Sequence, residues 1–223
     1  MEHASIAAFA RFSLELLALG APADLVEASN AAMVDETRHA RLGFSLASHY
    51  AGVPVGPGAL DLDGALDGRT TEDFLRTLVL EGCIGETRAA LEASHALSTC
   101  KDPIVAEILA EIAEDEARHA ELAWRTLQWL LAQRPALRKV VEQTLQDALA
   151  AVAQAPSVAH GDLPNAGLAH ELAAHDVLPA ELQDALHSEV LREVVEPCVK
   201  AVFAALPASA AQTAAPRSGA LAA

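Results

Sequence analysis

The sequence predicts an all-α protein, a four-helix bundle with one long crossover followed by a C-terminal helical extension. Alanine, leucine and glutamate recur along the 223 residues, and all three are strong helix formers. Apolar residues return at the spacing of an amphipathic helix, and few stretches alternate with the period of two that marks a strand. The local sequence also repeats after about 80 residues, which indicates two similar helix pairs.

The first helix pair precedes a long connection. Residues 2–20 are predicted to form an amphipathic helix that ends before Pro22. Asp24 is a suitable N-cap for a second helix that runs to about Tyr50. Glycine, proline and aspartate then fill residues 51–70, which we predict to be the crossover.

The second helix pair has its own start and stop signals. Thr70 or Thr71 caps a third helix that runs to about Thr99. A fourth helix begins at Pro103, since proline is tolerated in the first turn, and it ends near Arg134. A short turn, a long crossover and a second short turn therefore connect the four helices.

We divide the chain into three parts. Residues 1–134 form the bundle, and residues 135–206 form the C-terminal extension, with helical stretches at about 136–154 and 179–206. Residues 207–223 have low complexity and are predicted to be disordered.

The charge of the chain limits its partners. The formal net charge is -16, whereas binding to nucleic acid or to an anionic membrane requires a basic face. We therefore expect neither partner. No apolar run is long enough to span a bilayer, and the N-terminus has no signal-peptide pattern. The three cysteines form no CxxC pair, which favours a reducing compartment and a cytoplasmic location.

The repeat carries the strongest functional signal. The segment VDETRHARL, with Glu36 and His39, lies 80 positions before EDEARHAEL, with Glu116 and His119. Each Glu-x-x-His pair places a carboxylate and an imidazole on one helix face. The third predicted helix extends about ten residues upstream of Glu81, while the first helix starts next to its repeat partner, which suggests that upstream residues are missing.

Two Glu-x-x-His pairs and one glutamate from each remaining helix are the ligand set of a two-metal carboxylate site. Carboxylates can bridge two metals, and imidazole suits iron. A further copy, Glu92-x-x-His95, lies too far along its helix to share the site, and we assign it to chance. The predicted metal ligands are Glu2, Glu36, His39, Glu81, Glu116 and His119. No catalytic residue is predicted beyond them.

Three further acids are candidates for the surroundings of the metals. Asp35 and Asp115 lie four residues before the histidines, where a carboxylate can accept the free imidazole N–H. Glu86 falls among apolar residues, five positions after Glu81, and is an alternative ligand or a second acid. Gly82 and Gly85 leave either a small pocket or room for close helix packing.

At these motifs the chain resembles the ferritin-like di-iron carboxylate superfamily. The resemblance covers residues 1 to about 132 and rests on Glu2, Glu81 and the segments DETRH and DEARH. The segment LEGCIGETR at 80–88 is similar to the third helix of tRNA-modifying di-iron hydroxylases, in which a ligand glutamate is followed five residues later by another. The resemblance implies the fold and the metal site, but the acidity of this chain argues against a tRNA substrate. The chain looks closer to uncharacterised bacterial ferritin-like proteins.

Three functions are compatible with these features. The first is an oxidase or oxygenase in which two iron ions activate dioxygen to oxidise an unknown small molecule. The second is a ferroxidase or peroxide-consuming, iron-handling protein. The third is a non-catalytic helical partner module. Manganese or a mixed iron–manganese pair accepts the same ligands, and a homodimer is compatible with the sequence.

Overall fold

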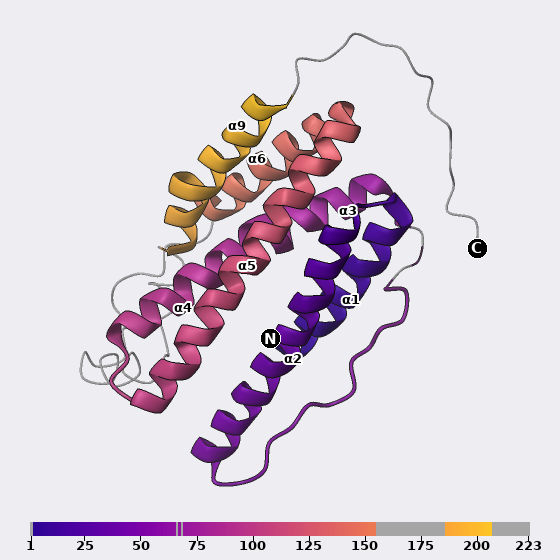
Figure 1. Ribbon diagram of the computed structural model, residues 1–223. Helices are drawn as coiled ribbons and strands as arrows, with labels where there is room; N and C mark the ends of the chain where they lie inside the picture. Colours follow the sequence, from indigo (N-terminus) through magenta and orange to yellow (C-terminus); the bar gives the residue numbers. More distant parts are fainter. Residues whose placement is uncertain (1, 66, 68, 155–185, 207–223) are drawn as a thin grey trace.

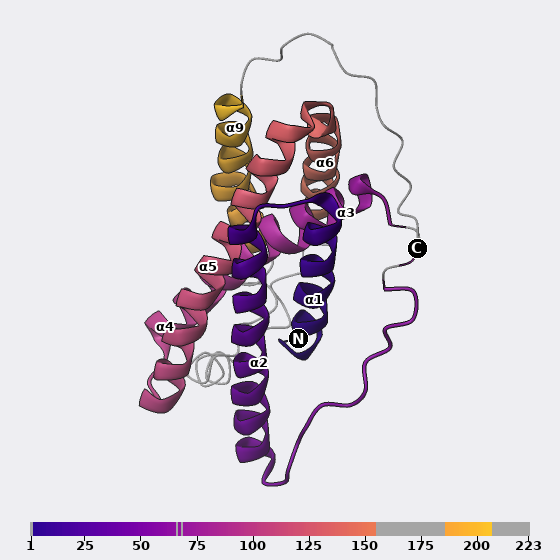
Figure 2. The ribbon, with the colours of Figure 1, turned by 45° about the vertical axis from the view of Figure 1, so that its right-hand side comes forward.

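The computed structural model describes residues 2–65, 67, 69–154 and 186–206 of the chain. Within these residues all regular secondary structure is helical and there is no β-strand, and a long non-helical connection joins Ala51 to Thr71 (Figures 1 and 2). The all-α prediction is therefore confirmed for the described part. The predicted disordered tail at 207–223 and the beginning of the predicted helix at 179–206 lie outside it.

The first two helices form an antiparallel pair. Helix α1 spans Glu2–Leu19, and helix α2 spans Ala23–Ala51. The reversal between them uses Gly20 at a φ of 72°, a backbone conformation that favours glycine. A hydrogen bond of 2.7 Å joins the buried hydroxyls of Ser13 and Ser29 across the pair. Helix α2 continues beyond the start of α1, as both ribbon views show (Figures 1 and 2).

The third predicted helix is a continuous rod that changes type in its middle. It consists of α3 (Thr71–Thr77), the π-helix η1 (Leu78–Glu86) and α4 (Thr87–Thr99). Thr70 and Asp73 form a capping box at its start, which satisfies two backbone N–H groups. π-Helical segments are rare and are often found at functional sites.

Helix α5, Pro103–Gln133, lies at the centre of the arrangement. Its N-cap is Asp102, whose side chain accepts hydrogen bonds from the first backbone N–H groups. Helix α5 packs against α4 and η1 on one side and against α2 on the other. The two helices that carry the Glu-x-x-His pairs are therefore direct neighbours.

The C-terminal helices pack on the third helix. They are η2 (Pro135–Leu137), α6 (Arg138–Gln154), η3 (Val190–Val195) and α9 (Glu196–Ala205). Helix α6 contacts α3 and η1, and η3 contacts η1 and α4. Their buried side chains belong to the same hydrophobic core as those of the first four helices, which places a layer of helices behind η1. Among the described residues, no helix is both long and apolar enough to cross a membrane.

Candidate metal centre

Two neighbouring helices supply four buried polar side chains. Glu36 and His39 come from α2, and Glu116 and His119 come from α5. Each of these residues is at most 4 % exposed. Because residues three apart lie on one face of an α-helix, each pair points as a unit toward the opposite helix. Buried carboxylates are costly unless they are paired or coordinate a metal.

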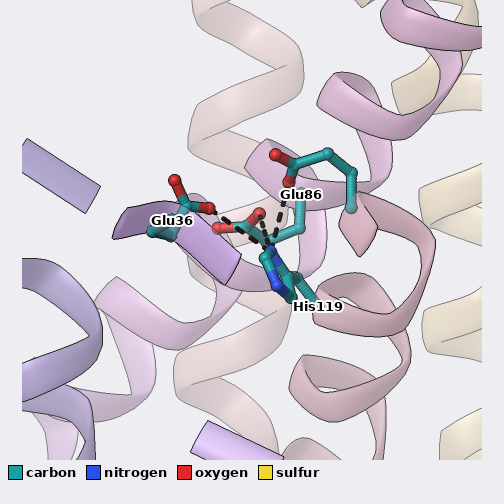
Figure 3. Close-up of side chains that lie close together, drawn as sticks. Glu36, Glu86 and His119 are labelled. Atoms are coloured by element: carbon teal, nitrogen blue, oxygen red, sulfur yellow. Dashed lines mark ion pairs between the residues drawn. The ribbon is translucent and has the colours of Figure 1, made fainter. Parts of the chain in front are cut away.

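His119 is the meeting point of three carboxylates from three helices. Its Nδ1 lies 3.3 Å from Oε1 of Glu36, 3.4 Å from Oε2 of Glu116 and 3.7 Å from Oε2 of Glu86. Figure 3 shows the side chains of Glu36 and Glu86 both approaching the imidazole of His119, Glu36 from the left of the view and Glu86 from above. Ligand atoms of these four residues all lie within 4.8 Å of one another, so the group could hold a metal ion.

His39 extends the cluster on the α2 side. Its Nδ1 lies 3.4 Å from Oε1 of Glu116 and 3.9 Å from Oε2 of Glu36. The Nδ1 atoms of both histidines and Oε2 of Glu36 are buried without a hydrogen-bond partner. Buried polar atoms are rarely left unsatisfied. Unpaired imidazole nitrogens and a carboxylate oxygen in one place are a donor set that suits a metal ion such as iron.

The far side of each imidazole is held by an aspartate. Nε2 of His39 lies 2.9 Å from Oδ2 of Asp115, and Nε2 of His119 lies 3.4 Å from Oδ2 of Asp35. Each aspartate thus contacts the histidine of the opposite helix, not the one four residues along its own helix. An Nε2–H that donates to a carboxylate leaves Nδ1 free as the metal-binding atom.

Two arginines fix these aspartates. Arg38 donates to Asp35 at 3.1 Å and also to Asp115, and Arg118 donates to both aspartates as well. Burial opposes ionisation of Asp115, but hydrogen bonds from His39 and Arg118 outweigh it and lower its pKa. Asp115 therefore stays a carboxylate that accepts the imidazole N–H.

Protons occupy the cluster when no metal is bound. Burial alone would lower the pKa of His119, but its carboxylate neighbours, Glu116 first among them, raise it to about 12. Burial raises the pKa of Glu86 to about 8. For Glu116, burial is outweighed by its close contacts with the two histidines, His119 first, and its pKa is lowered. Metal binding must displace such protons from its ligands.

The structure separates the two glutamates of η1. Glu86 reaches the cluster, whereas the side chain of Glu81 is 58 % exposed and makes an ion pair of 2.7 Å with Arg11. The repeat favours Glu81 as the ligand, whereas it is Glu86 whose carboxylate lies in the cluster. The apolar neighbours of Glu86 were the sequence signal for this position.

Two further residues singled out in the sequence are Glu2, a predicted ligand, and Gly82, predicted to leave either a pocket or room for close packing. Glu2 begins α1, and its side chain is outside the described part, so its role as a ligand stays a prediction. The part of α1 that meets the site is Phe9, whose ring centroid lies 5.0 Å from that of His119. At Gly82 a Cβ atom would lie 2.8 Å from Cβ of Ala123, so this glycine permits close packing of η1 on α5.

Comparison of the chain with family models, with curated proteins and with solved structures found no match. The site and the helical packing are therefore interpreted from their own geometry.

Proposed function

We propose that this chain is a ferritin-like four-helix bundle with one long crossover, and that it holds two iron ions and activates dioxygen. The proposed ligands are Glu36, His39, Glu86, Glu116 and His119, with Glu2 as the remaining candidate. The observation that carries the proposal is the group of orphaned buried atoms, since two imidazole Nδ1 atoms and a carboxylate oxygen face one space from two helices. Iron held there would supply the electrons that reduce dioxygen, and an organic molecule would be the substrate oxidised.

The protein part of this activity is binding and positioning. Glu116 lies within 3.4 Å of both imidazoles, so its carboxylate would hold metal together with the histidines of both helices. Asp35 and Asp115 hold the two imidazoles with Nδ1 directed at the carboxylates. The arginines offset the charge of the aspartates, so a strongly anionic ligand set can be kept within the protein at neutral pH.

A second candidate is an iron-handling function, in which Fe(II) is itself the substrate that dioxygen or peroxide oxidises. The net charge of -16 favours this candidate because an acidic surface raises the local concentration of cations. Manganese fits the same ligands.

The first experiment is anaerobic loading with Fe(II), followed by determination of iron per chain and by absorbance spectra after dioxygen is added. Two irons per chain and a new near-ultraviolet or visible band are expected. The variants Glu36→Ala and His119→Ala should lose iron and remain helical by circular dichroism. Wild-type protein that binds no iron would refute the proposed site and leave a helical partner module. Oxidation of an added organic molecule would favour the oxidase or oxygenase candidate. Oxidation of excess Fe(II) without organic turnover would favour the iron-handling candidate.

A further inference from the structure

The pair formed by α1 and α2 has an uncovered outer face. The pair lies at one side of the molecule, away from α4 and α9 (Figure 1). Within the described part of the chain α1 packs mainly against α2, yet apolar residues occur all round it, since its charged residues besides His3 are only Glu2, Arg11 and Glu15. A helix that is apolar on all sides is normally buried on all sides. The exposed side of α1 therefore has the composition of a contact surface.

Large apolar side chains are exposed on this face. Leu14 and Leu17 of α1 are both more than half exposed, and Val34 of α2 is 62 % exposed. All three lie away from the buried sides of their helices. Single apolar residues on a surface need no explanation, but a group of them marks an interaction surface.

A row of exposed side chains follows the outer side of α2. Its spacing alternates between three and four residues, so the side chains form one line that drifts only about 20° in seven residues. The outer row consists of Glu27, Asn30, Val34, Thr37 and Arg41. The chain has 31 acidic residues, but the row has a single acid and a single base. Two copies can therefore meet at this row without bringing carboxylates together.

The two charges of the outer row are placed for pairing with a second copy. Glu27 and Arg41 each lie seven residues from Val34, which is about 10 Å along the helix. Neither makes an ion pair with a residue that the structure describes. In a two-fold contact the same surface is used by both copies, so residue i of one faces residue j of the other, and j faces i. When two α2 helices run antiparallel with Val34 at the axis, Glu27 of each copy faces Arg41 of the other.

We propose that the outer row is a homodimer interface, in which the α2 helices of two copies pack antiparallel about a two-fold axis at Val34. The two valines meet at the axis, and an ion pair between Glu27 and Arg41 closes each end. The interface goes beyond the proposed function, because none of its residues belongs to the metal cluster and dimerisation needs no metal. Failure of iron binding would leave it standing.

The first helix fits the same arrangement. The hydroxyls of Ser13 and Ser29 meet across the antiparallel pair of α1 and α2. Counting from this contact, Val34 is level with the segment from Ala7 to Ala10 of α1. The distance between two packed helices depends on the side chains at their contact. These alanines are small, so the α1 helices of the two copies can approach each other as closely as the α2 helices do.

Sedimentation of the full chain over a range of concentrations measures the dimer. The wild type should dimerise equally with and without iron. Val34→Glu makes two carboxylates face each other at the axis and should weaken the dimer by about 100-fold or more. Val34 is exposed, so circular dichroism should show an unchanged fold. Ile104→Glu is the matched control, because Ile104 is an even more exposed apolar residue at the start of α5, outside the row.

Exchange of charges tests the register of the two helices. Glu27→Arg and Arg41→Glu each bring like charges together at both ends, so each variant alone should dimerise about tenfold or more weakly than the wild type. A mixture of the two variants should form a heterodimer, because opposite charges then face each other at both ends. Tags of different mass identify the heterodimer in native mass spectrometry.

Three results would overturn the inference. A monomeric wild type would show that the outer face serves a different protein partner. A dimer that survives Val34→Glu would use another surface. A mixture of the two charge variants that forms no heterodimer would show that Glu27 and Arg41 do not face each other across the contact.

Discussion

Replacing Glu86 with glutamine tests which glutamate of the third helix belongs to the metal site. Burial raises the pKa of Glu86 to about 8, so at pH 7 most of the metal-free protein carries this side chain as a neutral acid. A glutamine amide has nearly the same shape and no charge. We therefore expect metal-free Glu86→Gln to unfold at a higher temperature than the metal-free wild type at pH 7, because the wild type must take up a proton on Glu86 when it folds and glutamine need not.

Metal affinity should respond in the opposite way. A ligand carboxylate binds metal only after it has lost its proton, and glutamine has no proton to lose. Removing a group that merely orients a ligand costs about 10–100-fold in metal affinity, so removing a ligand should cost at least about 100-fold. Anaerobic competition for Fe(II) against a chelator measures the affinity, and thermal unfolding of the metal-free protein measures the stability.

Glu81→Gln is the matched control on the same helical segment. Its side chain is 58 % exposed and pairs with Arg11, and an exposed ion pair contributes about 0–1 kcal/mol. Neither stability nor iron affinity should change much. A variant series in which Glu81→Gln loses iron while Glu86→Gln keeps it would show that the assignment of Glu86 is wrong.

The same variant has a pH signature in the metal-free state. The pKa of Glu86 is higher in the folded protein than its ordinary value of 4.5. Its contribution to stability is therefore fully present below about pH 4.5 and is lost as the pH rises through about 8. Glu86→Gln should lack this loss, so its stability should fall less than that of the wild type over this window when urea unfolding is compared at several pH values.

Three further substitutions have defined expectations. Asp115→Asn weakens the hold on the opposite imidazole and should lower iron affinity by about 10–100-fold in the chelator assay. Gly82→Ala would place a Cβ atom 2.8 Å from that of Ala123 and should destabilise the protein by about 1–3 kcal/mol through overpacking. Its control is Gly43→Ala, which meets nothing within 4 Å in a helix interior and should stabilise by about 0.5–1 kcal/mol in the same urea titration. Asp102→Ala removes the N-cap of α5 and should cost about 0.5–2 kcal/mol, and no loss in thermal unfolding would refute its capping role.

The contributions of α2 and α5 to the site could be predicted because they depend on local geometry alone. A glutamate and a histidine three residues apart share a face in any regular α-helix. The repeat then indicated that two such faces, those of Glu36 and Glu116, belong to equivalent helices. Which side chain the aspartates contact could not be predicted, because it depends on the separation of two helices and on the two arginines between them.

The third helix shows where prediction from the sequence stops. Its limits, about Thr70 to Thr99, agree with those of the α3–η1–α4 rod. The π-helical hydrogen bonding of η1, however, has no signal in the apolar pattern, and it changes which residues share a face. The alignment with Glu2 selected Glu81 because it counts positions along the sequence and takes no account of a π-helical turn. The packing of α6 and η3 on this rod is a tertiary contact that periodicity does not encode.

The repeat is symmetric at the centre of the site and asymmetric at its edge. At the centre each half completes the other, because His39 faces Glu116 while His119 faces Glu36, and the aspartates cross in the same way. Neither half holds a finished ligand set by itself, so metal binding should require both helix pairs to be docked. At the edge, η1 presents the partly buried carboxylate of Glu86 to the cluster, whereas α1 presents the ring of Phe9. The surroundings of His119 therefore differ between the two halves of the repeat, with an acid from η1 and an aromatic ring from α1.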